Sequence, residues 1–341
     1  MPLADVDPAG NDAPIRFPAW AGRARSLASA ALLVAVLAFG AWALRGMAWR
    51  GLWNAMARAD PGWLALAAAL NLCVIGLQAL RWLALLRPIS PRPRLTDTFQ
   101  AMIVGLSVSA VVPARAGELV RMRWLHRRTG LSQATVLGSI GLDQWANAGG
   151  FVAGLGALTL MGGLPRVGRG GAVVAVALFS LGLAVLVALP RLGRGARGAR
   201  PGEAPGRPPG WRDRLRQGLL ASESPPALAR AFAASLAAWA LEVVVLRFAL
   251  RAVGVELALT ASLVVLLAVN LVLALPLVPP GNFGTLETGA TISLLGYGVG
   301  KERALAFALL YHALQIGPIA ILGLVLAGRS ARRGRPLPSR R

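Results

Sequence analysis

The sequence predicts an all-α polytopic membrane protein, with about six spanning helices and two re-entrant helical hairpins arranged as an inverted repeat. Three features lead to this prediction: the composition, the lengths of the apolar segments and the placement of the basic residues between them. Of the 341 residues, 56% are hydrophobic and 15% are charged, and the mean hydropathy is +0.60. Soluble domains average about 25% charged residues, so this composition favours a chain that lies largely in a bilayer.

The apolar segments have lengths that distinguish spanning helices from interrupted ones. A helix needs about 20 apolar residues to cross a bilayer. Six segments are long enough, and we expect each of them to span: 27–44, 62–86, 133–162, 171–190, 227–252 and 304–328. Two further segments are interrupted. Residues 99–113 are too short to cross, and 259–280 ends in a cluster of prolines.

The basic residues indicate that both interrupted segments return to the side from which they enter. With this topology and a cytoplasmic N-terminus, the cytoplasmic loops and tails hold 25 basic residues and the outer loops hold 7. If both segments crossed, this bias would disappear. The positive-inside rule therefore favours two re-entrant hairpins, near 99–129 and near 259–297, one from each face.

This topology divides the chain into five parts. They are a cytoplasmic N-terminal segment (1–26), a first membrane half (27–190), a cytoplasmic linker rich in Gly, Pro and Arg (191–225), a second membrane half (226–328) and a basic cytoplasmic tail (329–341). Acidic residues precede the first apolar segment and no small-residue cleavage site follows it, so we expect no cleavable signal peptide. The bias towards Ala, Gly, Pro and Arg indicates a GC-rich bacterial genome, and hence the bacterial inner membrane.

The two hairpins share a motif. Pro113-x-x-x-Gly117, followed by Glu118, corresponds to Pro280-x-x-x-Gly284, followed by Glu287. Proline cannot continue a helix and glycine permits a turn, so the two prolines and two glycines are predicted to break the helices. The hairpins open from opposite faces, which makes the repeat inverted, as in many transporters.

Two further sequence features accompany this repeat. Arg81 precedes the first proline by 32 residues, and Arg247 precedes the second by 33. Residues 117–129 are predicted to form a short amphipathic helix. Its apolar face would carry Leu119, Met122 and Leu125.

Polar side chains inside the apolar segments are the candidates for a binding site. An ionisable residue at mid-span costs about 2.5–3.5 kcal/mol and usually faces the protein interior. Ser139, Asp143 and Asn147 form one helical stripe, and Asn71, Gln78 and Arg81 form another. We expect a polar cavity between the hairpins. Its expected substrate-binding residues are Arg81, Arg115, Glu118, Arg121, Asp143, Asn147, Glu242, Asn282 and Glu287.

Several candidates have a structural alternative. Arg81 stands near a helix end, where its side chain can extend to the interface. Asp143 can hold helices together by hydrogen bonds. Asn282 can cap the following helix, and Glu287 then lies near the positive end of the helix dipole. His126 and His312 are isolated, and we interpret both as structural.

Other classes of function lack the residues they require. The sequence holds no nucleophile–base set, metal-ligand spacing or phosphate loop, so we expect no catalytic residue, metal or cofactor. Cys73 is the lone cysteine, which excludes an internal disulfide. The net charge of +22 lies in short loops rather than in a groove with stacking aromatics, so we expect no nucleic-acid partner. No ATPase motif is present, so any transport would be passive or ion-coupled.

At the two hairpins the sequence resembles the membrane region of the lysylphosphatidylglycerol synthase family, a flippase-like domain. The resemblance is carried by PARAGELVR (113–121), DQWAN (143–147) and PPGNFGTLE (279–287), and it covers 25–328. Gln144 and Asn147 stand where the family usually has Arg and Asp, and Tyr311-His312 stands where an arginine is common. Only RSARRGRPLPSRR follows the last apolar segment, so we expect no aminoacyl-transferase domain and no lysine transfer.

The resemblance implies a lipid flippase that moves a polar-headed lipid, phosphate-bearing or polyprenyl-type, through a central cavity. Arg115 and Arg121 would bind a phosphate. Glu118, Asp143 and Glu287 would neutralise these arginines or contact a cationic or hydroxylated head group. The alternatives are a membrane glycosyltransferase, an ion or small-solute transporter, and an accessory subunit of an envelope-lipid biosynthesis pathway. The expected partners are membrane lipids and the enzymes of such a pathway.

Overall fold

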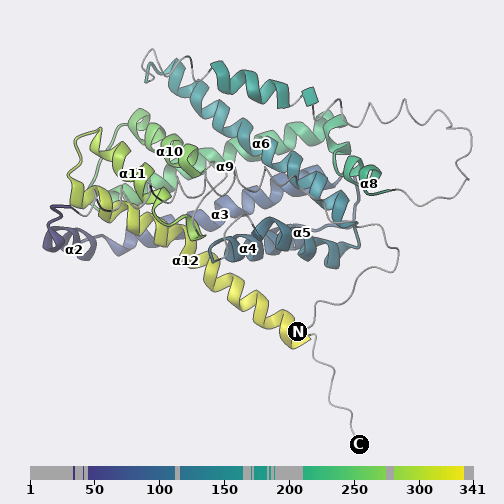
Figure 1. Ribbon diagram of the computed structural model, residues 1–341, viewed down its shortest axis with the longest axis horizontal. Helices are drawn as coiled ribbons and strands as arrows, with labels where there is room; N and C mark the ends of the chain where they lie inside the picture. The colour runs from purple at the N-terminus through teal and green to yellow at the C-terminus, as the bar shows by residue number, and fades with distance from the viewer. Residues whose placement is uncertain are drawn as a thin grey trace, which may run out of the picture.

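The computed structural model describes residues 45–111, 116–163, 210–273 and 280–333, with residues 34, 41 and 170 and parts of 173–188 in addition. The described residues form helices and no strand, so the prediction of an all-α chain is confirmed for this part of the protein (Figure 1). The helices are α2 (Trp49–Ala57), α3 (Pro61–Leu86), α4 (Leu95–Ser109), α5 (Ala116–Thr129), α6 (Gln133–Leu160), α8 (Trp211–Gly218), η1 (Leu220–Glu223), α9 (Pro225–Ala252), α10 (Leu259–Leu273), η2 (Pro280–Asn282), α11 (Thr285–Leu295) and α12 (Lys301–Arg333).

Three of these helices are long and apolar enough to cross a membrane: Pro61–Leu86, Pro225–Ala252 and Lys301–Arg329. They lie on the predicted spans 62–86, 227–252 and 304–328. Helix α6 covers most of the predicted span 133–162 but carries polar residues in its middle. The predicted span 27–44 lies almost wholly outside the described residues, and within 171–190 the structure describes a shorter apolar helix, Val173–Gly182.

The long helices begin at capping and proline signals in the sequence. The Asp60 side chain accepts hydrogen bonds from the backbone N–H groups of Gly62 and Trp63, and Pro61 occupies the first helical position of α3. Proline is favourable there because its missing N–H would have no partner within the helix. Helix α9 likewise begins with Pro225, and Ser132 caps α6 by accepting from the Thr135 N–H.

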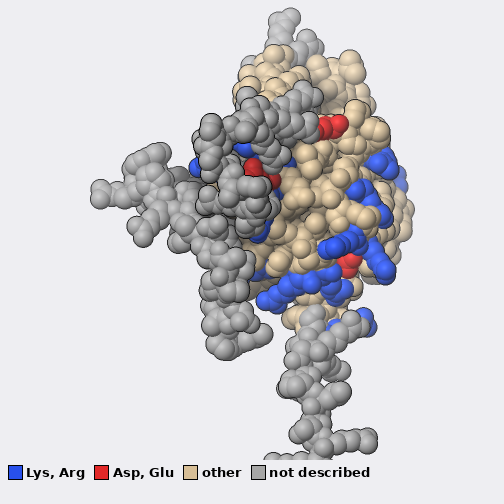
Figure 2. All heavy atoms as spheres, turned by 90° about the vertical axis from the view of Figure 1, so that its right-hand side faces the viewer, with Lys and Arg blue, Asp and Glu red and all other residues tan. Residues whose placement is uncertain are grey.

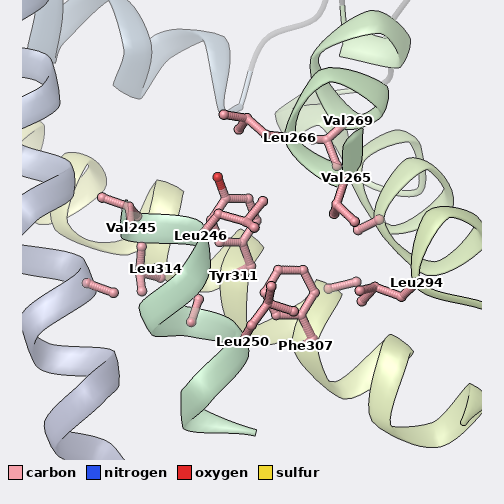
Figure 3. Close-up of a cluster of buried hydrophobic side chains, with 14 of the residues drawn as sticks. Val245, Leu246, Leu250, Val265, Leu266, Val269, Leu294, Phe307, Tyr311 and Leu314 are labelled. Atoms are coloured by element: carbon pink, nitrogen blue, oxygen red, sulfur yellow. The ribbon is translucent and has the colours of Figure 1, made fainter. Parts of the chain in front are cut away.

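Helices α3 and α9 pack along each other and form the centre of the molecule. The largest apolar core lies where α9, α10, α11 and α12 meet, and the ring of Tyr311 lies within it (Figure 3). Leu246, Leu250, Leu266 and Phe307 are each at most 1% exposed. Burying a side chain of this size contributes about 1.5–3 kcal/mol, so this cluster holds the second half of the chain together.

The order and length of the helices repeat along the chain. A long helix, a 15-residue helix, a break, a short helix and a second long helix occur as α3 to α6 and again as α9 to α12. Helix α9 begins 164 residues after α3, and α10 begins 164 residues after α4. The repeat inferred from two short motifs therefore extends over complete helices.

Helices α4 and α5 pack closely because glycines face each other across them. A Cβ added to Gly117 would overlap the carbonyl oxygen of Gly105 and the hydroxyl of Ser109. We expected Gly117 to permit the turn. Instead, Gly117 is the second residue of α5, and its lack of a side chain allows this close approach.

Helix α5 coincides with the short helix predicted over residues 117–129. Of its apolar residues, Met122 and Leu125 are buried inside the molecule, whereas Leu119 is 54% exposed. Arg121 is also buried, because it pairs with Asp143. The apolar periodicity did not indicate that this arginine lies inside the molecule.

Candidate functional site

A central cavity of about 250 Å³ lies where the two helix breaks meet. Its wall includes Ser109 and Ala110 at the end of α4, and Gly281 and Asn282 just before α11. The two breaks touch, because a Cβ built on Gly281 would lie 2.7 Å from the carbonyl oxygen of Ala110. Gly281, Asn282 and Gly284 all have positive φ angles, so the chain turns sharply before α11.

The cavity is lined by many polar side chains although the surrounding helices are apolar. They come from α3, α4, α6, α9, α10, α12 and the turn before α11. They are Asn71, Gln78, Ser109, Asn147, Glu242, Asn270, Asn282, Tyr311, His312 and Gln315. Polar side chains inside apolar helices are unfavourable unless they bind partners or a ligand. This concentration marks the cavity as the candidate functional site.

Behind the α6 side of the cavity, Asp143 binds two arginines. Arg81 Nε donates to Asp143 Oδ1 at 2.8 Å, and Arg121 Nη2 donates to Asp143 Oδ2 at 2.8 Å. Asp143 is fully buried, and Arg81 is 2% exposed. Arg81 Nη1 also donates to Asn147 Oδ1 at 2.8 Å. This cluster joins α3, α5 and α6, and Asn147 connects it to the cavity.

Two sequence interpretations change with this geometry. Arg81 does not extend to an interface, since its guanidinium is buried against Asp143. Arg121 lies over the ring of Trp82, 3.8 Å from the centroid, so a cation–π contact adds to its ion pair. Arg121 was expected to bind a phosphate, but its described contacts hold helices together and it does not line the cavity.

On the opposite wall, Glu242 of α9 accepts two hydrogen bonds from α12. Tyr311 OH donates to Glu242 Oε1 at 2.7 Å, and Gln315 Nε2 donates to the same oxygen at 2.6 Å. All three side chains line the cavity. Glu242 was expected at the site, whereas Tyr311 and Gln315 were not.

His312 connects α12 to the break before α11. Its Nε2 lies 2.7 Å from the carbonyl oxygen of Gly281, and its Nδ1 lies 2.6 Å from Glu287 Oε1. A carbonyl oxygen only accepts, so Nε2 donates to it, while Nδ1 and the Glu287 carboxyl share a proton. Glu287 Oε2 also accepts from the Gly284 N–H and thereby caps α11. The interpretation of His312 as a structural residue agrees with these contacts, but its position in the cavity wall was not foreseen.

The cluster around Asp143 in the first half and the cluster around Glu242 in the second half have the same arrangement of contacts. In each, one side chain of a long helix binds two residues, four apart, on the last helix of its half. These sets are Arg81 with Asp143 and Asn147, and Glu242 with Tyr311 and Gln315. The offset from Asp143 to Tyr311, and from Asn147 to Gln315, is 168 residues, which is also the offset between the starts of α6 and α12. Extending the sequence repeat to these helices would have identified Tyr311 and Gln315.

The first-turn glutamates of the two short helices are also equivalent. Glu118 of α5 accepts a hydrogen bond from Gln144 Nε2 at 3.0 Å, and Glu287 of α11 binds His312. Gln144 and His312 are again 168 residues apart. In the first pair Glu118 is half-buried and Gln144 is exposed, whereas Glu287 and His312 are both buried and His312 lines the cavity. The equivalent contact therefore belongs to the cavity in the second half only.

The other residues singled out in the sequence do not belong to these clusters. Pro113 and Arg115 lie outside the described residues. Asn282 is exposed at the cavity wall and has a positive φ of 61°. Arg247 donates to the Leu257 carbonyl oxygen and to Ser262, so it fastens a loop and has no contact equivalent to that of Arg81. Within the described part of the chain, no group of three or more His, Cys, Asp or Glu side chains is placed to hold a metal ion.

These features define an all-helical, multi-pass membrane protein with a polar cavity between two broken helices. The chain belongs to the family of the lysylphosphatidylglycerol synthase TM region, whose model matches residues 27–323. Membership of this family indicates a membrane protein of lipid metabolism or transport. No curated protein matches the chain.

Proposed function

We propose that this protein is a lipid transporter, not an enzyme, and that it moves the head group of a polar lipid across the bilayer through the central cavity. The observation that carries this proposal is the position of the cavity, at the contact between two broken helices and lined by polar side chains. Irregular backbone at membrane depth is tolerated where it is buried or lines a polar cavity. Broken helices that meet at a binding site are characteristic of transporters.

The cavity is sized for a head group and not for a whole lipid. Its volume of about 250 Å³ corresponds to about eight water molecules at ~30 Å³ each. Acyl chains would therefore remain in the surrounding lipid while the polar group passes. This division explains why the polar residues converge on one place between otherwise apolar helices.

We propose a topology of six spanning helices and two re-entrant hairpins, with both termini in the cytoplasm of a bacterial cell. The repeated order of α3 to α6 and α9 to α12 supports an internal repeat, which the positive-inside rule makes inverted. Basic side chains gather at the end of the molecule where α5 and α8 lie, and this end would face the cytoplasm (Figure 2).

Cysteine labelling tests this topology. In a Cys73→Ser background, Arg92→Cys and Glu256→Cys place single thiols in the loops that precede α4 and α10, at residues that are exposed. We expect membrane-impermeant reagents to label Arg92→Cys from the cytoplasmic side and Glu256→Cys from the outer side. Labelling of both from one side would overturn the inverted arrangement.

A vesicle assay tests the transport itself. The purified protein is reconstituted with lipids labelled in one leaflet, and the loss of this asymmetry is followed. Ser109→Phe fills the cavity wall at the end of α4, and we expect it to slow lipid movement at least tenfold. Val111→Phe is the matched control, because Val111 is 74% exposed and is not part of the cavity wall. Equal rates for wild type, both variants and empty vesicles would contradict the proposal.

A further inference from the structure

The central cavity is lined by polar atoms that have no hydrogen-bond partner among the described residues. Asn71 is only 2% exposed, and its Nδ2 has no hydrogen-bond partner among the described residues. Leaving a buried polar group unpaired costs about 1–3 kcal/mol. Because Asn71 lines the cavity, an occupant that accepts a hydrogen bond from it would recover this free energy.

In three other lining residues, one side-chain polar atom is hydrogen-bonded and the other has no partner among the described residues. Glu242 accepts both of its hydrogen bonds at Oε1, and Asn147 accepts from Arg81 at Oδ1. Asn270 donates from Nδ2 to the Leu266 carbonyl oxygen. The atoms without a hydrogen-bond partner in the described structure are therefore Glu242 Oε2, Asn147 Nδ2 and Asn270 Oδ1. Together with Asn71 Nδ2, these atoms comprise two donors and two acceptors.

The charge of the cavity wall disfavours a phosphate. The nearest buried arginines, Arg81 and Arg121, bind Asp143 and lie outside the described lining. His312 is bound to Glu287 and to the Gly281 carbonyl oxygen. Among the described residues, a phosphate in this space would therefore meet the Glu242 carboxylate and no unpaired cation, which is unfavourable in a low-dielectric site.

An ammonium group also fits poorly. It would pair with Glu242, but it has donors only and cannot accept from Asn71 or Asn147. A hydroxyl group both donates and accepts, so adjacent hydroxyls satisfy donors and acceptors together. A site built to bind hydroxyls discriminates strongly against groups that lack them, because its buried polar atoms are then left unpaired.

We infer that the cavity receives an uncharged, hydroxyl-rich head group, such as a glycerol or a single sugar unit, in preference to a phosphate. In this arrangement the hydroxyls donate to Glu242 Oε2 and Asn270 Oδ1 and accept from Asn71 Nδ2 and Asn147 Nδ2. The cavity volume of about 250 Å³ accommodates one such unit. That such a head group is transported rests on the proposed function. That the cavity prefers it can be tested by lipid binding alone.

The binding experiment compares two lipids with identical acyl chains. Native mass spectrometry of the purified full-length protein measures retention of glucosyl-diacylglycerol and of phosphatidic acid. We expect at least tenfold tighter binding of the glucosyl lipid. Asn71→Leu and Glu242→Gln should each reduce this preference about tenfold. Asn54→Leu, which lies on α2 outside the central cavity, should leave it unchanged.

The outcomes separate the inference from the transport proposal. Equal or tighter binding of phosphatidic acid overturns the inference, as does an unchanged preference in either folded cavity variant. Circular dichroism identifies a variant that fails to fold, and the other variant then decides. If the glucosyl lipid binds selectively but reconstituted vesicles do not move it, the inference holds and the transport proposal fails. If the two lipids bind equally and vesicles move both equally fast, transport holds and the head-group inference is wrong.

Discussion

The carbonyl oxygen of Ala110 lies against Gly281, with no room for a side chain between them. This contact joins the end of α4 to the turn before α11, so the breaks of the two halves of the chain touch at the cavity wall. The opposite side of the same turn is held by His312, through the Gly281 carbonyl oxygen. The shape of the cavity therefore depends on one short turn that is fixed from two sides.

Gly281→Ala tests this contact. A positive φ costs a residue with a Cβ about 1–2 kcal/mol, and here the new Cβ would also meet the Ala110 oxygen. Gly298→Ala is the matched control, since Gly298 has a φ of 76° but nothing within 4 Å of its Cβ position. We expect both variants to lose stability in detergent unfolding, and only Gly281→Ala to lose lipid movement in vesicles. Equal transport by the two variants would show that the contact is dispensable.

Asp143→Asn should be among the most destabilising single substitutions. The change leaves two buried guanidinium groups without a carboxylate, and breaking a buried ion pair in this way costs about 3–5 kcal/mol. Arg128→Gln breaks the partly exposed Arg128–Asp97 pair instead, which is worth about 0–1 kcal/mol. We expect the unfolding midpoint in detergent to fall much further for Asp143→Asn than for Arg128→Gln. A midpoint for Asp143→Asn close to that of Arg128→Gln would argue against a structural role for the cluster.

Gly117→Ala should separate α4 from α5. The added methyl would overlap backbone atoms of Gly105, which cannot move without shifting a helix. Overpacking of this kind typically costs about 1–3 kcal/mol. Gly141→Ala is the control, because Gly141 is helical with open space at its Cβ position, so alanine there should stabilise α6 by about 0.5–1 kcal/mol. Thermal unfolding should shift in opposite directions for the two variants, and parallel shifts would contradict the packing argument.

Glu118→Ala and Glu287→Ala compare equivalent positions in the two halves. Glu287 is buried, caps α11 and binds His312, so its loss leaves buried donors unpaired at about 1–3 kcal/mol each. The hydrogen bond from Gln144 to Glu118 lies at an exposed position, where the loss of a hydrogen bond costs less. We expect Glu287→Ala to lower the unfolding midpoint clearly more than Glu118→Ala. The reverse order would mean that α5 contributes more to stability through its first-turn glutamate than α11 does.

Much of the helical framework follows from local signals. Three apolar segments form helices long enough to cross a membrane, Asp60-Pro61 and Ser132 begin α3 and α6, and Gly284 of the second proline–glycine motif directly precedes α11. The stripe containing Asp143 and Asn147 predicted one polar face of α6, and that face binds Arg81. Such signals depend on neighbouring residues, so they can be read from the sequence alone.

The pairing across helices could not be predicted in the same way. Arg81 and Asp143 are 62 residues apart, and whether Arg121 binds a ligand or Asp143 depends on how α5 rotates against α6. The apolar periodicity does not indicate this rotation, since Leu119 is exposed while Arg121 is buried. Tyr311 and Gln315 resemble ordinary residues of an apolar helix, and only the helix-length repeat relates them to Asp143 and Asn147.

The small volume of the cavity has a consequence for adaptation to temperature. Adjusting the length and unsaturation of fatty acids keeps membranes fluid and alters lipid tails without altering the head group to which they are attached. A pocket of about 250 Å³ that contacts only the head group does not sense this change. On the proposed function, the same protein would recognise its cargo equally well in a cold-adapted and a warm-adapted membrane.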